Sequence, residues 1–333
     1  MALLSSLVPS TVAFILSATS TFILIPPFAK CMRKKGIVGI DVHKVSKPEI
    51  PEMVGITFPI CLAIALLGGL FLVPKEAFPQ ILSFYLTVLI VALVGILDDL
   101  KGLGPHTKPL LTALGGLPIL ALGTYNPRPT LPFVGVTRLH YIYPLSIPLA
   151  IAVTSNAMNM ADPVNGCMSG SSSILFLTLA LASIALGREN ALLLALSCLG
   201  YALALFYYNR YPARVFTGDV GSLSLGAAIG AIAILGQMEI VAVVAMMPQI
   251  MNAFTILTSV GRLFERRELP ERPTKISSDN RIYASTSRKA PITLARMILA
   301  AKPMEERELA LEFIKLTAFS SILALITAFF MVV

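Results

Sequence analysis

Residues 80–101 read QILSFYLTVLIVALVGILDDLK, in which residues 80–97 carry no charge and Asp98 and Asp99 follow at once. A helix that crosses a bilayer needs about 20 consecutive, mostly apolar residues, because the hydrocarbon core is roughly 30 Å thick. This stretch therefore predicts a transmembrane helix that carries two adjacent carboxylates to one surface of the membrane.

Nine further apolar stretches can be interpreted by the same rule, so the sequence predicts about ten transmembrane helices. Of the 333 residues, 56% are hydrophobic and 13% are charged, whereas an ordinary soluble domain carries about 25% charged residues. We therefore expect an all-α polytopic membrane protein in which residues 1–333 form a single transmembrane catalytic domain. The expected spans are residues 8–28, 53–73, 80–97, 109–123, 143–161, 169–186, 190–208, 220–236, 239–261 and 309–331.

The basic residues indicate how these helices are oriented. Most of the 26 Lys and Arg residues follow odd-numbered spans, and the loops after even-numbered spans hold Lys75, Arg128, Arg138 and Arg188. Because cytoplasmic loops are enriched in Lys and Arg, we expect the odd-numbered loops in the cytoplasm and both termini outside. This topology accounts for most of the net charge of +8, so we expect a multi-pass protein of the cell membrane with no nucleic-acid partner.

The longest cytoplasmic loop, residues 262–308, contains two expected elements of its own. Residues 274–284 predict a small β-hairpin, and residues 291–302 predict a short amphipathic helix that lies on the membrane surface. On the outer side, residues 131–141 predict a second hairpin. Pro248 lies near the middle of the ninth span and predicts a kink or break in that helix.

Acidic and amide side chains gather where three of the expected helices end at the cytoplasm. An Asp at the centre of a membrane helix costs about 2.5–3.5 kcal/mol to insert, and less near the interface. Adjacent carboxylates also repel each other, unless a cation lies between them or one binds a proton. The side chains concerned are Asp98 and Asp99 after the third span, Asn156, Asn159, Asp162 and Asn165 around the end of the fifth, and Asp219 at the start of the eighth.

The types of side chain in this group favour a hard divalent cation and a phosphate. Carboxylate and amide oxygens without His or Cys are typical ligands of Mg²⁺ or Mn²⁺, and Mg²⁺ often completes its coordination with water and substrate phosphate. Residues 218–222 open the eighth helix with glycines, and we expect free backbone N–H groups there that attract an anion. With Lys108 at the same level, the sequence predicts a site for a pyrophosphate.

Three motifs, taken in order on one membrane face, resemble the polyprenyl-phosphate N-acetylhexosamine-1-phosphate transferases. The chain lacks the histidine cluster that the bacterial enzymes carry in the last inner loop, and it is therefore most similar to the dolichyl-phosphate GlcNAc-1-phosphate transferase branch. The resemblance favours an archaeal source. The motifs are Asp98-Asp99, Asn156-x-x-Asn159-x-x-x-x-x-Asn165-Gly166 and Phe216-x-Gly218-Asp219-x-Gly221-Ser222.

The resemblance implies a role for each matching residue. Asp219 and Asn159 are implied to hold Mg²⁺, and Asp98, Asp99 and Asp219 are implied to be catalytic. The substrate-binding residues that it implies are Lys108 for the pyrophosphate, Phe216 for stacking on uracil, Asn165 and Gly166 for uracil contacts, Arg272 for the sugar and its phosphate, and Asp162, which keeps the first aspartate of the bacterial motif where Asn165 replaces the second.

The function expected from the resemblance is the transfer of N-acetylglucosamine-1-phosphate, or a related HexNAc-1-phosphate, from a UDP-sugar to a polyprenyl phosphate of the dolichyl type. The reaction releases UMP, depends on Mg²⁺, and begins the assembly of a lipid-linked glycan at the cytoplasmic face. The expected partners are UDP-GlcNAc or a related UDP-sugar, the polyprenyl phosphate and membrane lipid. A homodimer, and a direct or a covalent-intermediate mechanism, stay open. The alternative function is a secondary transporter of an anionic solute, which would place ionisable residues near the middle of the membrane.

Several of these residues also have a purely structural interpretation. Asp219 at the start of a helix can act as a capping residue, and Asn159 and Asn165 can join helices by hydrogen bonds. Phe216 can simply fill an interface. Asp98 can take a proton from the acceptor phosphate or merely orient it, because a phosphate monoester with a second pKa of about 6 is largely ionised at pH 7.

Overall fold

The computed structural model describes residues 2–261 and 271–332, with side chains from Ser6 to Gly261 and from Glu271 to Met331. Its helices are α1 (Ala2–Lys34), α2 (Thr57–Leu70), α3 (Phe78–Lys101), α4 (Thr107–Ala113), α5 (Leu117–Ala121), α6 (Ile142–Met160), α7 (Cys167–Ala185), α8 (Glu189–Asn209), α9 (Gly218–Leu235), α10 (Glu239–Ala245), α11 (Met247–Val260), α12 (Leu294–Leu299) and α13 (Glu306–Val332). Three antiparallel strand pairs accompany them: β1 (Val38–Ile40) with β2 (Glu49–Pro51), β3 (Thr130–Leu131) with β4 (Gly135–Val136), and β5 (Thr274–Ile276) with β6 (Ile282–Ala284).

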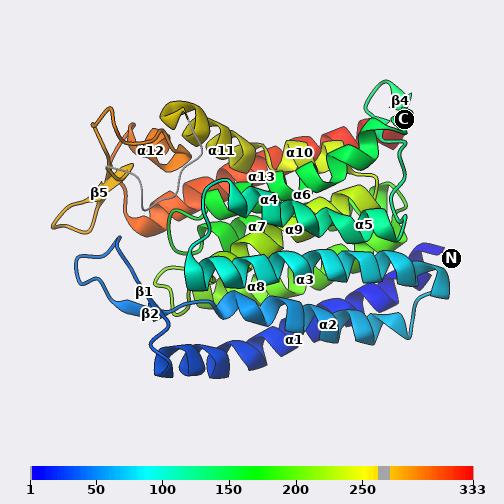
Figure 1. Cartoon of the computed structure of the whole chain (residues 1–333), viewed down its shortest axis with the longest axis horizontal. Helices are drawn as coiled ribbons and strands as arrows, with labels where there is room; N and C mark the ends of the chain where they lie inside the picture. The colour runs from blue at the N-terminus through cyan, green and yellow to red at the C-terminus, as the bar shows by residue number, and fades with distance from the viewer. Residues whose placement is uncertain (1, 262–270, 333) are drawn as a thin grey trace.

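The long helices run along a common direction and form one bundle (Figure 1). Both chain termini lie at one end of this bundle, whereas β1, β2, β5 and α12 lie at the opposite end. The two termini are therefore on the same side, which agrees with an even number of crossings.

Six helices within the described residues are long and apolar enough to cross a membrane. They match the first, third, sixth, seventh, eighth and tenth expected spans, and they identify an integral multi-pass membrane protein. The exact count of ten expected spans is not confirmed. The six segments are Ser6–Lys34, Lys75–Lys101, Cys167–Ala185, Glu189–Asn209, Gly218–Leu235 and Glu306–Met331.

The other four expected spans differ from a single long apolar helix for identifiable reasons. The second is a shorter apolar helix, Val54–Leu70. The fourth is divided between α4 and α5 by a 3₁₀ turn at Leu114–Gly116, where two successive glycines weaken the helix. The fifth is α6, whose last turns carry the polar Asn156 and Asn159.

The ninth span is bent, as Pro248 predicted. Helices α10 and α11 meet at an angle of 68°, and Pro248 is the second residue of α11. A proline in a helix lacks the N–H donor, and its ring clashes with the carbonyl four residues earlier. The break therefore falls in the turn that precedes the proline.

The loop structures are partly as expected. The hairpin predicted for residues 274–284 is confirmed as β5 and β6, whereas the hairpin predicted for residues 131–141 forms earlier in the chain, as β3 and β4 within residues 130–136. The amphipathic helix is shorter than predicted, because α12 spans only Leu294–Leu299 after Thr293, whose side chain caps it. The pair β1–β2 was not predicted, and residues 262–270 of the loop expected in the cytoplasm lie outside the described residues.

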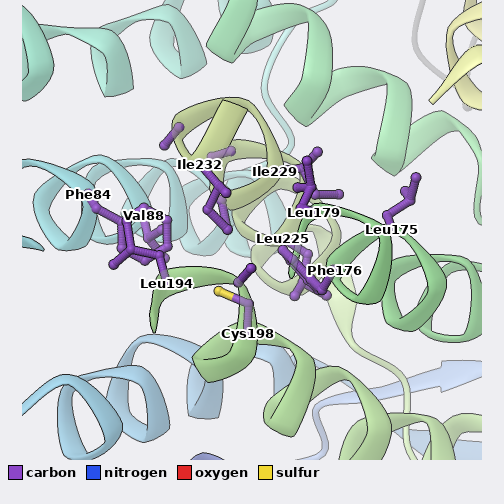
Figure 2. Packing of buried hydrophobic residues seen from close by; sticks show 14 of the residues in the cluster. Phe84, Val88, Leu175, Phe176, Leu179, Leu194, Cys198, Leu225, Ile229 and Ile232 are labelled. Carbon is purple, nitrogen blue, oxygen red and sulfur yellow. The ribbon is translucent and has the colours of Figure 1, made fainter. Parts of the chain in front are cut away.

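Helix α9 is the centre of the bundle, since every residue from Val220 to Leu235 is buried. Apolar side chains of α3, α7 and α8 meet it there (Figure 2). Small residues allow close approach: a Cβ on Gly95 of α3 would lie 2.4 Å from the Cα of Val220, and one on Gly226 would lie 2.4 Å from the Thr154 carbonyl oxygen of α6. This packing fixes the ends of α3, α6 and α9 relative to one another.

Candidate active site

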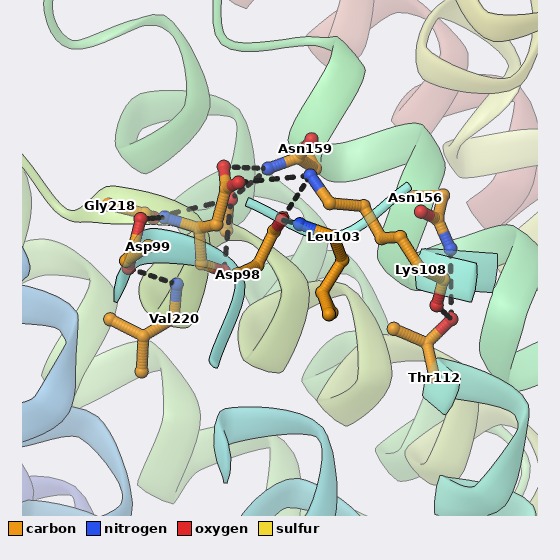
Figure 3. A network of polar contacts seen from close by, with 11 residues as sticks. Asp98, Asp99, Leu103, Lys108, Thr112, Asn156, Asn159, Gly218 and Val220 are labelled. Atoms are coloured by element: carbon orange, nitrogen blue, oxygen red, sulfur yellow. Dashed lines mark hydrogen bonds and ion pairs between the residues drawn. The ribbon is translucent and has the colours of Figure 1, made fainter. Parts of the chain in front are cut away.

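Four helices bring a cluster of polar side chains together at one end of the bundle, and we call it the carboxylate centre: Asp98, Asp99, Lys108, Asn159 and Asp219 (Figure 3). The Lys108 ammonium contacts the Asp98 carboxylate, and it lies 2.9 Å from Asp219 Oδ2. Asn159 Nδ2 donates to the other oxygen of Asp219 at 2.6 Å. Residues far apart in the sequence, from α3, α4, α6 and α9, thus meet at one point.

Asp99 has a different environment from its neighbour Asp98. Its two carboxylate oxygens accept hydrogen bonds from the backbone N–H groups of Asp219 and Val220, at 2.8 and 3.0 Å. Thr217, which precedes α9, makes no capping hydrogen bond with its side chain. Asp99 therefore caps α9 from a neighbouring helix and places negative charge at the positive end of the helix dipole.

This contact corrects one expectation from the sequence. We expected the backbone N–H groups at the start of the eighth span to be free for phosphate, but those of Asp219 and Val220 are already occupied by Asp99. The cause is the close packing of α3 on α9, which a sequence pattern does not report. These two N–H groups are therefore not available to a phosphate at this site.

Gly218 is required by both conformation and space. Its φ is +70°, and a Cβ at this position would lie 2.6 Å from Asp99 Oδ2. A positive φ is costly for residues with a side chain, and here any side chain would also displace the cap. The glycine therefore allows Asp99 to reach the start of α9.

Lys108 neutralises two carboxylates that would otherwise repel each other. Its side chain is 20% exposed, and that of Asp98 is 5% exposed. Both carboxylates lie against the ammonium and favour its charged form, which offsets the cost of its burial. Lys108 is therefore positively charged at neutral pH and can bind an anion that approaches the site.

The donor atoms of the centre fit a hard divalent cation. Oxygens of Asp98 and Asp219 converge on the Lys108 ammonium, so the structure already places one positive charge where these carboxylates meet. Hard cations such as Mg²⁺ favour ligands of this kind. Asn159 directs its Nδ2 at Asp219, whereas an amide binds a metal through its oxygen. Asn159 would therefore hold a cation only after its amide group had rotated by a half-turn.

A second group surrounds Asn165 and Gly166, in the turn between α6 and α7. Asn165 is buried, its Nδ2 donates to Asp41 Oδ2 at 2.9 Å, and its backbone N–H donates to Glu306 Oε1 at 3.0 Å. Asp41 follows β1, and Glu306 is the first residue of α13. The Asn165 amide is thus oriented with its nitrogen toward Asp41, which leaves its oxygen as the acceptor for other groups.

Asn209, the last residue of α8, connects this turn to the segment that leads into α9. Its Oδ1 accepts from the backbone N–H of Gly166 at 3.2 Å and from Ser169 Oγ at 2.8 Å. Its Nδ2 donates to the Val215 carbonyl at 3.0 Å. The Asn165 turn and the residues just before Asp219 are therefore held by one buried side chain.

Comparison with known proteins identifies the family. The family model described as glycosyl transferase family 4 matches residues 81–237. A putative glycosyltransferase of Methanocaldococcus jannaschii is 31% identical over 303 residues, which cover 90% of this chain and 88% of the relative. The chain belongs to glycosyl transferase family 4.

Two further relatives of this glycosyl transferase come from different branches. A putative UDP-N-acetylglucosamine–dolichyl-phosphate N-acetylglucosaminephosphotransferase of Saccharolobus solfataricus is 32% identical, over 76% of this chain and 78% of the relative. A phospho-N-acetylmuramoyl-pentapeptide-transferase of Moorella thermoacetica is 33% identical, over 68% and 76%. The stretch matched by the family model includes the whole carboxylate centre.

Phe216 lies three residues before Asp219 in this glycosyl transferase. Its backbone N–H donates to the Pro51 carbonyl at 2.8 Å, and its carbonyl accepts from Val54 at 3.1 Å. The ring is half-buried, and a Cβ on Gly39 would lie 2.8 Å from it. The residues around β1 and β2 therefore hold the backbone of Phe216 in place, and its ring lies against Gly39 of β1.

Arg272 and Asp162, two further predicted substrate-binding residues, lie in connecting segments. Arg272 is exposed and stands two residues before β5. Asp162 is half-buried in the turn after α6. Their implied roles stay predictions.

Sequence reasoning missed Asp41, Glu306 and Asn209. Glu306 is an acid at the boundary of an apolar span, the same signal that drew attention to Asp98, and it could have been found in that way. Asp41, His43 and Glu306 place potential ligand atoms within 4.8 Å of one another. Lys44 Nζ lies 2.5 Å from Asp41 Oδ2 and 4.0 Å from Glu306 Oε2, so these side chains form an ion-paired group, to which we assign no metal.

Proposed function

We propose that this glycosyl transferase moves N-acetylglucosamine-1-phosphate, or a related HexNAc-1-phosphate, from a UDP-sugar to a polyprenyl phosphate of the dolichyl type. The reaction releases UMP and begins a lipid-linked glycan. The observation that carries the proposal is the convergence of Asp98, Lys108 and Asp219 at one end of the bundle. The name of the Saccharolobus relative supports the choice of sugar and acceptor.

In this proposal an oxygen of the lipid phosphate attacks the β-phosphorus of the UDP-sugar. The bond between that phosphorus and the bridging oxygen breaks, and UMP leaves with the oxygen. Phosphoryl transfer depends mainly on positioning and on stabilising the charge of the phosphates. Lys108 supplies a fixed positive charge for the pyrophosphate, and Asp98, held by the Leu103 backbone N–H at 2.7 Å, faces the acceptor and orients it or takes its proton.

The proposal includes a Mg²⁺ ion, or Mn²⁺, held by Asp219 and Asn159. When bound, the cation supplies positive charge that stabilises the leaving phosphate. Lys108 would remain beside Asp98 and Asp219 and would add its own positive charge to that of the cation. Asp99 keeps Asp219 in place by capping α9, and its implied catalytic role stays a prediction.

The remaining parts of the proposal concern the nucleotide and the membrane. Asn165, with its oxygen available as an acceptor, and Phe216 bind the uracil, and Arg272 contacts the sugar phosphate. Lys and Arg are enriched in the loops after the odd-numbered spans, the same side on which the residues of the carboxylate centre lie. This enrichment supports an active site that faces the cytoplasm. The family supports a transferase over a secondary transporter of an anionic solute.

The test is a reconstituted reaction of the purified protein with UDP-GlcNAc and a polyprenyl phosphate, in which UMP release and the mass of the lipid product are measured. We expect Asp219→Asn and Lys108→Gln each to lower the rate by about 10²–10³-fold, the usual effect of losing one electrostatic contact to a transition state. Asp279→Asn, on the exposed tip of the β5–β6 hairpin, makes the same chemical change as the first variant and should not alter the rate. Wild-type rates in both site variants would contradict the proposal, and so would a lipid product without an added sugar phosphate.

A further inference from the structure

A cavity of about 540 Å³ opens between the ends of α7, α8 and α13, apart from the carboxylate centre. It lies at the same end of the bundle, because α8 ends there at Asn209 and α13 begins there at Glu306. Of its wall residues, the proposed function uses only Asn165. The lining residues are Asn165, Gly166, Phe206, Tyr207, Arg210, Tyr211, Pro212, Arg214, Arg307, Ala310, Leu311 and Ile314.

Three arginines concentrate positive charge in this cavity. The guanidinium groups of Arg210 and Arg214 lie over the Tyr207 ring, 5.3 and 4.5 Å from its centre. Arg214 also donates to the Tyr207 carbonyl at 2.9 Å, which fixes it in place. In the part of the chain that the structure describes, none of the three arginines forms an ion pair with a carboxylate. All three side chains are exposed, so their charge is available to an external anion.

The other wall of the cavity is apolar and is formed by side chains of the membrane-crossing helices α8 and α13. Leu311 and Ile314 are on the first turns of α13, and Phe206 is on the last turn of α8. Tyr207 and Tyr211 are exposed at the same level, where tyrosines are typical of the interface between membrane and water. A ligand that fits both walls has an anionic head and an apolar tail.

We propose that this cavity binds the head group of an anionic phospholipid from the leaflet at the same end of the bundle as the carboxylate centre. The lipid phosphate is bound by Arg210, Arg214 and Arg307, because arginine pairs with phosphate through two parallel N–H donors. The acyl or isoprenoid chains follow Leu311 and Ile314 into the hydrocarbon. Basic clusters beside membrane helices attract anionic lipids in this way.

The cavity is joined to the proposed nucleotide site through the backbone. A Cβ on Gly166 would lie 2.9 Å from the Cα of Arg210, so the arginine backbone packs directly on the turn that carries Asn165. A bound lipid therefore holds the end of α8 against this turn. The lipid site itself does not depend on which sugar or acceptor the enzyme uses.

The absence of tryptophan from the chain allows a direct test. Leu311→Trp places a single fluorophore in the wall of the cavity, at a side chain that is 44% exposed. The protein is reconstituted in phosphatidylcholine, and quenching by brominated phosphatidylglycerol is compared with quenching by brominated phosphatidylcholine at equal mole fractions. Phe319→Trp, on a lipid-exposed position of the same helix but outside the cavity lining, reports the bulk lipid.

We expect the relative binding constant of phosphatidylglycerol at the Leu311→Trp position to exceed that of phosphatidylcholine by at least about fivefold, the contribution of a single arginine near an anionic lipid. At Phe319→Trp the ratio should be close to one. Adding Arg210→Gln and Arg307→Gln to Leu311→Trp should return the ratio toward one, whereas Lys289→Gln with Lys302→Gln, exposed residues at the same end and outside the cavity, should not. Unchanged quenching by brominated phosphatidylcholine shows that the variants are folded.

Competitors distinguish the lipid from other anions. Unbrominated phosphatidylglycerol should relieve the quenching, and inorganic phosphate or UMP at millimolar concentration should not. A ratio near one at Leu311→Trp overturns the proposal. Relief by inorganic phosphate would show a site for free phosphate instead of a lipid, and relief by UMP would show that the cavity belongs to the nucleotide site; either result also overturns it.

Discussion

Replacing Asp99 by asparagine separates the structural contribution of this residue from the chemistry of its neighbour. In the structure both carboxylate oxygens of Asp99 accept backbone N–H groups of α9, at 2.8 and 3.0 Å. Asparagine keeps one acceptor oxygen but turns an NH₂ group toward the second N–H donor. The substitution should therefore weaken the cap and loosen the start of the helix that carries Asp219.

The size of the effect follows from these contacts. A hydrogen bond to a charged group contributes about 1.5–3 kcal/mol, and a charge at a helix end contributes about 0.3–1 kcal/mol, or more where it is partly buried. Losing one such bond and the charge should lower the free energy of unfolding by about 2–4 kcal/mol. At about 2 °C per kcal/mol for a chain of this size, the melting temperature should fall by about 4–8 °C.

The buried thiols provide the assay. Cys167 and Cys198 are fully buried, so a thiol-reactive dye becomes fluorescent as the bundle unfolds. Asp279→Asn, whose side chain is about half exposed, is the matched control and should leave the melting temperature unchanged. Asp99→Asn should also release UMP more slowly at a temperature where it is folded, because Asp219 is displaced. An unchanged melting temperature together with lost activity would refute the capping role and support direct participation of Asp99 in the reaction.

Three further variants test other parts of the site. Gly218→Ala places a side chain at a φ of +70° and 2.6 Å from Asp99 Oδ2. It should lower the free energy of unfolding by at least about 1 kcal/mol, as measured by the same thiol assay. A melting temperature equal to that of the wild type would contradict this. Asp41→Ala removes the acceptor that orients the Asn165 amide. It should raise the KM for the UDP-sugar by about tenfold, the value of one hydrogen bond, and should change the KM for the lipid little. An equal rise in both KM values would argue against a nucleotide contact. Lys108→Arg keeps the charge but not the compact ammonium, and it should retain more activity than Lys108→Gln in the UMP-release assay; equal loss would mean that charge is not what the residue supplies.

The membrane class and most of the helices could be predicted from the sequence because long uncharged apolar runs are typical of transmembrane helices. The fifth span was less apolar than a typical transmembrane helix because of two polar residues in the predicted site. Asn156 and Asn159 lower the hydropathy of α6 because they serve contacts inside the bundle, and Asn156 Nδ2 donates to Thr112 Oγ1 of α4 at 3.0 Å. Functional or connecting polar residues thus weaken the pattern on which a prediction of spans depends.

The pair β1–β2 could not be predicted, because strands of three residues are too short to show a period of two. Their importance lies in long-range contacts. Asp41 follows β1 and binds Asn165, which is 124 residues away, and Pro51 at the end of β2 binds the backbone of Phe216. Such pairings appear only when the bundle has brought the loops together.

The different fates of Asp98 and Asp99 show what a motif can and cannot tell. Successive residues on a helix point about 100° apart, and neighbours at i and i+1 do not face the same partner. Asp98 therefore faces Lys108, while Asp99 faces the start of α9. The motif locates the carboxylate centre, but its two carboxylates have different partners because their side chains point in different directions. The cation and the catalytic role implied for both residues stay predictions. In this chain the first acid of the pair, Asp98, points into the carboxylate centre. The second, Asp99, caps α9, the helix that carries Asp219.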